Sequence, residues 1–351
     1  MALFTKNYLG IDIGASSIKV VEISISGKKR KLENYIEFKM PLSEQSLKTF
    51  HGESAALLSN EVSEILQAIL RRAKIKERKI ALSLPDFSTF FTTFSLPPMT
   101  EIEVPQAIEF EAKHYIPLPL SEVTFDWQII DKEESISGLK RRVLLVAIPN
   151  TVLQNYQRVA ALCSLEIVGM EAEVFSLIRS AWPGGKYDFL PICMVDFGWK
   201  STTVSIVEKK KVAASFCFDI SSIALTKDLS LALGISLEEA EKLKIIHGLD
   251  PQKPEIAKVL LDKINLLTME IDKICGDFFQ ATGRRVDNLV LSGGTANLFG
   301  LKEYLSARIK KNVLMAAPFS ALTCPVVLGQ RLNQIGPSFA VALGAALMSA
   351  D

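Results

Sequence analysis

The sequence has few of the residues that metal sites and nucleophilic active sites require. Its 351 residues include three histidines, His51, His114 and His247, and five cysteines. No two cysteines form a Cys-x-x-Cys pair, and no Ser/His/Asp set or metal-type His/Cys spacing is present. This argues against a zinc site and a nucleophilic triad. Cys193 and Cys217 lie in apolar runs, where reduced, buried thiols are usual, so we expect a reducing compartment.

The sequence also lacks an excess of one charge and a long apolar run. It has 40 basic and 39 acidic residues, which gives no field that would favour nucleic acid or anionic lipid. The most apolar long stretch, residues 339–350, is shorter than the ~20 residues of a membrane-spanning helix. There is no basic-then-apolar leader at the N-terminus. We therefore expect a cytoplasmic chain with no nucleic-acid partner and no direct membrane span.

A strand, a tight turn and a second strand follow one another near the start of the chain. Apolar residues flank the turn Gly14-Ala15-Ser16-Ser17, which has no bulky side chain and offers backbone N–H groups and two hydroxyls. These donors suit a phosphate. Asp12, just before the turn, is placed to hold a divalent cation through water. The alternative is an ordinary hairpin with a polar turn. The predicted nucleotide contacts here are Gly14, Ala15, Ser16, Ser17 and Lys19.

The same layout recurs later in the chain, where the spacing of Asp12, Gly14 and Ser17 is repeated. Two such hairpins, each preceded by a carboxylate, can close on one nucleotide from opposite sides. A matched pair of hairpins supports a nucleotide site much more strongly than one hairpin does. In the second copy the predicted metal residue is Asp196, and the predicted nucleotide contacts are Gly198, Lys200, Ser201 and Thr202.

A third glycine turn follows a short apolar strand over residues 287–291. It contains Gly293, Gly294 and Thr295, and a helix is expected from about residue 298. A strand, a glycine turn and a helix let a flat ligand lie against the backbone. The alternative is a plain strand-to-helix connection, which a lone Gly-Gly pair does not exclude.

Together, these three motifs resemble the signature of the actin/Hsp70/hexokinase ATPase superfamily. Within it, the whole chain resembles the PilM family of actin-like type IV pilus assembly proteins, which is close to the FtsA division proteins. The most characteristic segment lies outside the nucleotide motifs. It comprises Leu96-Pro97-Pro98-Met99 and the run Glu111-Ala112-x-x-Tyr115-Ile116-Pro117-x-Pro119.

The resemblance implies an α/β, actin-like ATPase fold with two ribonuclease-H-like domains around a nucleotide cleft. The first domain is expected over residues 1–86, 165–190 and 336–351, and the second over residues 191–335. Residues 87–164 are expected to form an inserted subdomain. Within it we expect a polar loop over 131–140 and a helix over 151–163 with Thr151 as its N-cap. Another helix is expected to start at Gly336-Pro337.

The resemblance also implies ATP and Mg²⁺ as cofactors and assigns roles to three further residues. Glu173 is expected to face the γ-phosphate and orient water. Family members usually have Pro after this Glu, whereas this chain has Val174, and a solvated glutamate favoured by the helix dipole is the alternative. Glu241 is expected to reach ribose hydroxyls and Lys244 the base. For this pair the alternative is an exposed helical ion pair.

Lys200 and Trp199 depart from the family pattern, because small residues usually occupy these positions in the second phosphate turn. Lys200 could add a charge-assisted contact to phosphate. Alternatively, the bulk of the two side chains could narrow the site and weaken binding. The sequence leaves both interpretations open.

For function, the resemblance implies an ATP-binding assembly factor of the type IV pilus inner-membrane platform. It would dock the N-terminal cytoplasmic tail of a PilN-type membrane protein, meet other platform proteins and hydrolyse ATP slowly or not at all; self-association is left open. The tail is expected between the inserted subdomain and the core, walled by residues 89–96 and 102–115. At least one of Phe90, Phe91 and Phe94 could line that groove, although each alone is more typical of a core residue.

Two other classes of protein are weighed against this one. An FtsA-like membrane tether is disfavoured because the sequence ends at Asp351 without a basic amphipathic tail. A sugar or metabolite kinase is disfavoured because no sugar-binding or zinc signature is visible and the insert would be unexplained. A component of a related secretion platform stays open.

Overall fold

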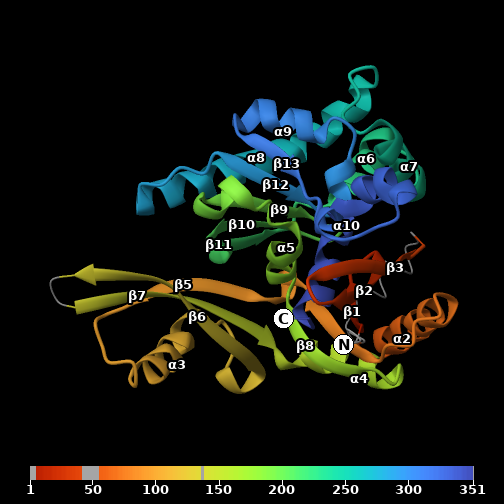
Figure 1. Ribbon diagram of the computed structural model, residues 1–351. Coiled ribbons are helices and arrows are strands. Elements are labelled where there is room, and N and C mark those ends of the chain that lie inside the picture. The colour runs from red at the N-terminus through yellow and green to blue at the C-terminus, as the bar shows by residue number, and fades with distance from the viewer. Residues whose placement is uncertain (1–4, 42–54, 136–137, 351) are drawn as a thin grey trace.

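A computed structural model of the chain describes residues 5–41, 55–135 and 138–350. Its centre is two five-stranded sheets with the orders β3-β2-β1-β4-β8 and β11-β10-β9-β12-β13. In each sheet three antiparallel strands are followed by two parallel ones. The expected duplication of an α/β unit is therefore confirmed. Figure 1 shows the second unit above the first, with a third, smaller sheet extending to one side.

The first unit is built on the predicted hairpin. Val62, Leu66 and Ile69 have helical spacing and are buried against Leu9 and Ile11 of the sheet. Apolar residues at helical spacing predict this helix over residues 54–74, and its predicted first residue, Ser54, lies outside the described residues. The elements of the first unit are β1 (Lys6–Ile13), β2 (Ser17–Ser26), β3 (Lys29–Lys39), α2 (Ala55–Arg72), β4 (Lys79–Leu84), β8 (Glu166–Ala172) and α5 (Glu173–Ala181).

The segment between β4 and β8 forms a three-stranded sheet, β5-β7-β6, with its own apolar core. The expected polar loop over 131–140 is wrong, because strand pairing continues from Asp131 opposite Arg142 to Ser135 opposite Gly138. A two-stranded ladder satisfies backbone groups that a loop would leave to water. The elements are β5 (Phe90–Leu96), α3 (Val104–Tyr115), β6 (Val123–Ser135) and β7 (Gly138–Pro149).

Helix α4 (Asn150–Leu162) follows β7 directly. Its N-cap is Pro149 and not Thr151, so that expectation was wrong. Val159 and Ala160 of α4 are buried with α2 in the first core. The end of the segment expected as the insert thus packs on the first unit, and the exact boundaries of the insert stay a prediction.

The second unit repeats the first and adds helices. Ser236 and Glu239 form a reciprocal capping box at the start of α7, which fixes where this helix begins. Strand β13 was not foreseen, since only four residues form it. The elements are β9 (Ile192–Phe197), β10 (Thr202–Glu208), β11 (Lys211–Phe218), α6 (Ser222–Leu233), α7 (Leu237–His247), α8 (Pro254–Thr282), β12 (Asn288–Ser292), α9 (Leu301–Ile309) and β13 (Asn312–Met315).

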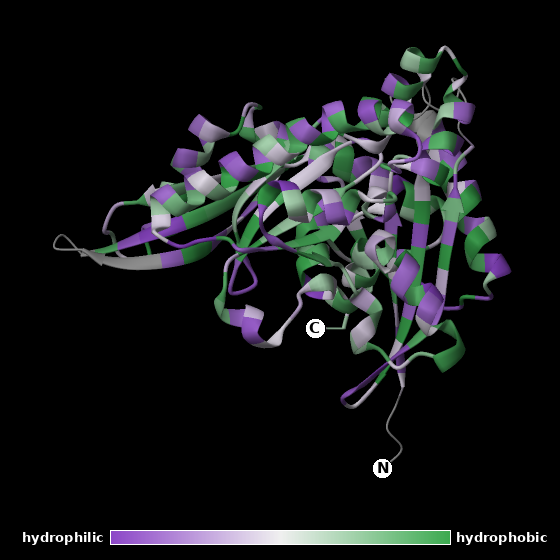
Figure 2. Cartoon of the chain, turned by 90° about the horizontal axis from the view of Figure 1, so that it is seen from above, coloured by the Kyte–Doolittle hydropathy of each residue, from purple (hydrophilic) through white to green (hydrophobic). Residues whose placement is uncertain are grey.

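The last helix, α10 (Gly329–Met348), runs back to the first unit. Its expected start at Gly336-Pro337 was wrong, because the helix begins at Gly329 and continues through Pro337. The carbonyl of Pro337 accepts hydrogen bonds from the Gly293 N–H and the Ser292 hydroxyl, so this turn packs on β12. In the described part of the chain, no helix combines the length and apolarity needed to span a membrane. Figure 2 shows green, hydrophobic residues along the central strands and mixed purple and green on the outer helices.

Candidate nucleotide-binding site

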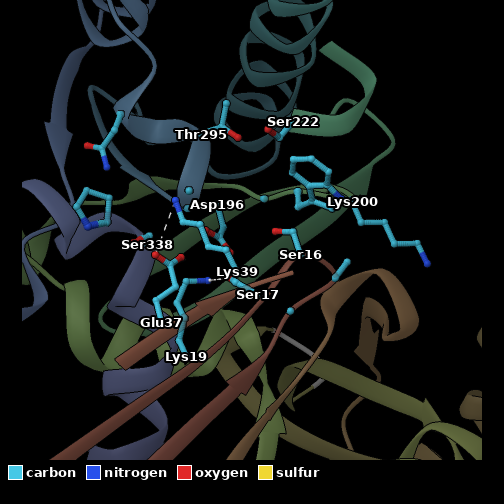
Figure 3. A pocket seen from close by; sticks show the side chains of 18 of the residues that line it. Ser16, Ser17, Lys19, Glu37, Lys39, Asp196, Lys200, Ser222, Thr295 and Ser338 are labelled. Atoms are coloured by element: carbon cyan, nitrogen blue, oxygen red, sulfur yellow. Dashed lines mark hydrogen bonds and ion pairs between the residues drawn. The ribbon is translucent and has the colours of Figure 1, made fainter. Parts of the chain in front are cut away.

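A cavity of about 680 Å³ lies where the turns of the two sheets meet α7 and α10. Figure 3 shows Ser16 and Ser17 from one sheet facing the same space as Asp196 and Thr295 from the other. The cavity therefore brings together motifs that are far apart in the sequence. The predicted site residues that line it are Asp12, Gly14, Ala15, Ser16, Ser17, Lys19, Glu173, Asp196, Gly198, Lys200, Ser201, Glu241, Lys244, Gly293, Gly294 and Thr295.

Thr202 is the one predicted contact that does not line the cavity. Its side chain is fully buried and donates to the Ile220 carbonyl. Successive residues of a strand point to opposite faces, so the neighbouring Thr203 lines the cavity instead.

The two predicted phosphate turns share one backbone hydrogen bond. The Gly14 N–H donates to the Ser17 carbonyl at 3.0 Å, and the Gly198 N–H donates to the Ser201 carbonyl at 3.0 Å. A Cβ on Gly198 would come within 2.8 Å of that carbonyl, so only glycine fits the second turn without movement. The repeated Asp-x-Gly spacing thus encodes one repeated structure.

Each turn is preceded by an aspartate beside a serine of the neighbouring parallel strand; the first aspartate is buried and the second is partly buried. Asp12 pairs in register with Ser83, and Asp196 with Ser292. The Ser83 hydroxyl donates to Asp12 Oδ1 at 3.2 Å, and Lys19 Nζ lies 3.7 Å from Asp12 Oδ2. Burial raises the pKa of Asp12 despite Lys19, and it raises the pKa of Asp196 to about 6.

These aspartates have the chemistry of a hydrated cation site. Within the described residues, no group of three or more His, Cys, Asp or Glu side chains forms a direct metal cluster. Asp196 Oδ1 is buried and has no hydrogen-bond partner among the described residues. A buried carboxylate oxygen without a donor is costly, and a magnesium-bound water is a donor that would satisfy it. The residues present therefore fit Mg²⁺ held through water.

Glu173 has a buried partner that the sequence analysis missed. The backbone N–H of Asp86 donates to Glu173 Oε2 at 3.1 Å, and the Val174 N–H donates to Asp86 Oδ1 at 3.3 Å. Burial raises the pKa of Glu173 well above its usual range, and burial together with the charge of Asp196 raises the pKa of Asp86 to about 7. Asp86 follows β4 by two residues, where the carboxyl ends of the parallel strands meet; that position is the signal that could have found it.

Glu241 and Lys244 line the cavity as an ion pair, with Lys244 Nζ 2.7 Å from Glu241 Oε2. The alternative of an exposed pair is wrong, because the Lys244 side chain is 2% exposed. Its Nζ also donates to Ser222 Oγ at 2.6 Å and to Thr226 Oγ1 at 2.8 Å. Burial lowers the pKa of Lys244 against the effect of Glu241. The lysine is thus held by α6, at the edge of the cavity.

Some residues that line the cavity belong to elements outside the three predicted motifs. They lie on the end of β3 and on α10, which reach the site only in the folded chain, and they include Glu37, Lys39, Arg331, Gln334 and Ser338. They surround the space between the hairpins with both charged and amide groups, which can contact the sugar and base of a nucleotide.

Comparison with known proteins identifies the family. The model for the type IV pilus assembly protein PilM matches residues 10–350. The chain belongs to the PilM family. This match covers both hairpins, the segment between β4 and β8 and the crossing helix, so the expected resemblance is confirmed over nearly the whole chain.

More distant relatives are division proteins. FtsA of Enterococcus faecalis is 22% identical over 371 residues, which is 90% of this chain and 79% of that protein. FtsA of Agrobacterium fabrum is 24% identical over 230 residues, which is 57% of this chain and 49% of that protein. The chain thus spans about half the length of the latter relative.

Solved structures agree on the fold. A PilM–PilN type IV pilus biogenesis complex matches with a TM-score of 0.82 and 22% identity over 98% of both chains. EutJ of Carboxydothermus hydrogenoformans matches with a TM-score of 0.58 and 16% identity, over 97% of this chain and 89% of that one. MreB5 of Spiroplasma citri bound to AMPPNP matches with a TM-score of 0.52 and 12% identity, over 98% of this chain and 96% of that one. The actin-like fold is therefore established.

A second cavity of about 400 Å³ lies between β5, the end of α3 and the edge strand β11. Phe90 and Phe91 line it together with Tyr115 and Phe216, which are 46% and 47% exposed. Phe94 does not line this cavity: its side chain is buried and stacks on the Tyr115 ring with the centroids 5.1 Å apart.

Proposed function

We propose that the chain is a nucleotide-binding assembly factor of the type IV pilus inner-membrane platform. The observation that carries the proposal is the family match over residues 10–350. In this role the protein binds the N-terminal cytoplasmic tail of a PilN-type membrane protein and stays peripheral to the membrane through that partner. The MreB5 neighbour carries AMPPNP, which supports a nucleotide in the cavity between the two sheets.

The nucleotide proposed here is ATP with Mg²⁺. The glycine turns offer N–H groups to its phosphates, and Asp12 and Asp196 hold the cation through water. Glu173 lines the cavity and is proposed to orient a water molecule toward the terminal phosphate through its side-chain oxygens. Turnover is slow or absent, and the bound nucleotide acts as a switch.

The tail is proposed to bind in the cavity beside β5. Phe90, Phe91 and Phe216 give it apolar walls, and β11 is the edge strand of its sheet. An extended apolar segment can add to such an edge and place alternate side chains in pockets.

The proposal is tested with a fluorescent peptide of the PilN-type protein's N-terminal tail, and with its scrambled sequence as a control. Anisotropy should show saturable binding of the native peptide only. Tyr115→Ala and Phe216→Ala should each weaken binding about tenfold, the typical effect of truncating a buried aromatic contact. Phe110→Ala is the matched control, because Phe110 is exposed on α3 and does not line the cavity. Absence of peptide binding by the wild type contradicts the proposal. Equal losses of peptide affinity in all three variants contradict binding in the cavity beside β5.

A further inference from the structure

Lys200 occupies an unusual position for a residue of a phosphate turn. The matching residue of the first turn is Ser16, whose hydroxyl points into the cavity in Figure 3. The Lys200 side chain instead extends away from Asp196 and Ser17. Its Nζ lies 3.9 Å from the centroid of the Phe87 ring. The cation therefore rests on an aromatic ring at the rim of the cavity.

Phe87 comes from the other side of the cavity. It lies in the single 3₁₀ turn Asp86–Ser88, which joins β4 of the first unit to β5. The adjacent Asp86 is buried and hydrogen-bonded to Glu173 and Val174, so the turn that carries the ring is fixed. Phe87 itself is 40% exposed and lines the nucleotide cavity. The contact thus joins the second phosphate turn to the first unit.

Two contacts of Lys200 compete when a phosphate is bound: the one with the Phe87 ring and a hydrogen bond to the phosphate. A cation over a partly exposed ring is a weak contact. A hydrogen bond from an ammonium group to a phosphate oxygen is roughly twice as strong as a neutral one and shorter. Lys200 is in the turn that faces the phosphates and has a long, flexible side chain. A phosphate in the cavity therefore competes successfully with the ring for this cation.

We propose that Phe87 is a positioning residue of the nucleotide site, which holds Lys200 withdrawn until the phosphates of a nucleoside di- or triphosphate draw it off the ring. This inference rests on the proposed nucleotide binding. Phe87 precedes β5 closely, and β7 also contacts β11 through the Arg142 Nη2 hydrogen bond to the Ala213 carbonyl. Loss of the Lys200 contact on nucleotide binding thus removes one of the links between the second unit and the segment that follows β4.

The test is a double-mutant cycle on the affinity for ATP with Mg²⁺, measured by calorimetry. Phe87→Leu keeps an apolar side chain but removes the ring, so ATP should bind about threefold more tightly, the factor that matches an exposed cation–π contact. Lys200→Met removes the phosphate contact, so ATP should bind about tenfold more weakly. In the Lys200→Met background, Phe87→Leu should not change the affinity for ATP. Phe87→Tyr keeps the ring and should behave as wild type.

Adenosine provides the matched control ligand, because it has no phosphate for Lys200. Its affinity should be the same in all five proteins, and melting temperatures establish that each variant is folded. The inference is overturned if Phe87→Leu weakens ATP binding, if its effect persists without Lys200, or if adenosine shows the same changes. A wild-type protein that binds neither ligand contradicts the proposed function itself, and the inference with it.

Discussion

Four carboxylates set the electrostatics of the cavity: Asp12 and Asp86 are buried, and Glu173 and Asp196 are partly buried. Burial is the main reason that the pKa of each is raised, and mutual repulsion adds to it for three of them. Only Lys19 is close enough to form an ion pair with one of them among the described residues. The Mg²⁺ ion of a magnesium–nucleotide complex would place positive charge beside these carboxylates. These residues therefore favour a cation over an anion alone.

Asp86 gives the protein a specific dependence on pH. Its pKa is raised from 3.8 to about 7 in the folded chain. Between about pH 4 and about pH 7 the native state thus holds a proton that the unfolded state has lost, so the free energy of unfolding falls as the pH rises through this range. Asp86→Asn, which stays neutral, should make that decline shallower in denaturant titrations. Asp287→Asn is the control, since Asp287 is exposed; an equal change in both variants would contradict the argument.

Glu173 is the candidate for orienting the attacking water. Glu173→Gln keeps an oxygen that can accept the Asp86 N–H but removes the group that can accept a proton from water. The affinity for ATP should change little, whereas single-turnover phosphate release should slow by about 10²–10⁴-fold, the usual contribution of a general base. Equal losses of affinity and rate would indicate a structural glutamate. If the wild type releases no phosphate, the protein is a nucleotide binder and not an enzyme.

Among the elements, α5 and α10 pack against each other and share one apolar cluster with β9 and β12 of the second unit. Gly344 of α10 lies so close to α5 that a Cβ would be 1.9 Å from the Ser176 carbonyl oxygen. Four buried alanines lie near it on α10: Ala340, Ala342, Ala345 and Ala346. Small residues let two helix backbones approach this closely, which explains why the apolar end of the chain is rich in alanine.

The close approach of α10 to α5 can be tested with two Gly→Ala changes. Gly344→Ala should lower the free energy of unfolding by about 1–3 kcal/mol, because the added methyl group overpacks the crossing. Gly276→Ala in α8 meets no atom within 4 Å and should raise stability by up to about 1 kcal/mol through helix propensity. Both values come from denaturant midpoints. Destabilisation by both changes, or by neither, would contradict the role given to the crossing.

At the scale of the whole molecule, the cavity lies between the two sheets, so a ligand there should stabilise both. ATP with Mg²⁺ at about 100 times its Kd should stabilise the native state by about 2.7 kcal/mol. The melting temperature should rise by several degrees, and Asp12→Ala or Asp196→Ala should remove the dependence on magnesium. Calorimetry checks binding directly. No heat and no thermal shift at saturating ATP would contradict nucleotide binding.

The sequence alone determined the duplicated α/β fold and most of the predicted residues that line the cavity, because both depend on local patterns. Strand–turn–strand segments follow from alternating apolar residues and a turn of small residues, and the Asp-x-Gly spacing repeats wherever that turn is repeated. Every predicted site residue except Thr202 lines the cavity. Thr202 was misplaced because a turn pattern does not fix which face of the next strand a residue takes.

Only the tertiary structure decided which distant residues complete the site. Asp86, Lys39 and Arg331 belong to no motif, since their positions depend on where β4 and β3 end and where α10 begins in the folded chain. The tertiary structure also decides the environment of Lys244. Its ion pair with Glu241 is covered by α6 and is not exposed. Lys200 and Phe87 are far apart in the sequence, and their contact exists because two separate units face one cavity. Local patterns fix the elements, whereas side chains from separate elements meet only once the chain has packed.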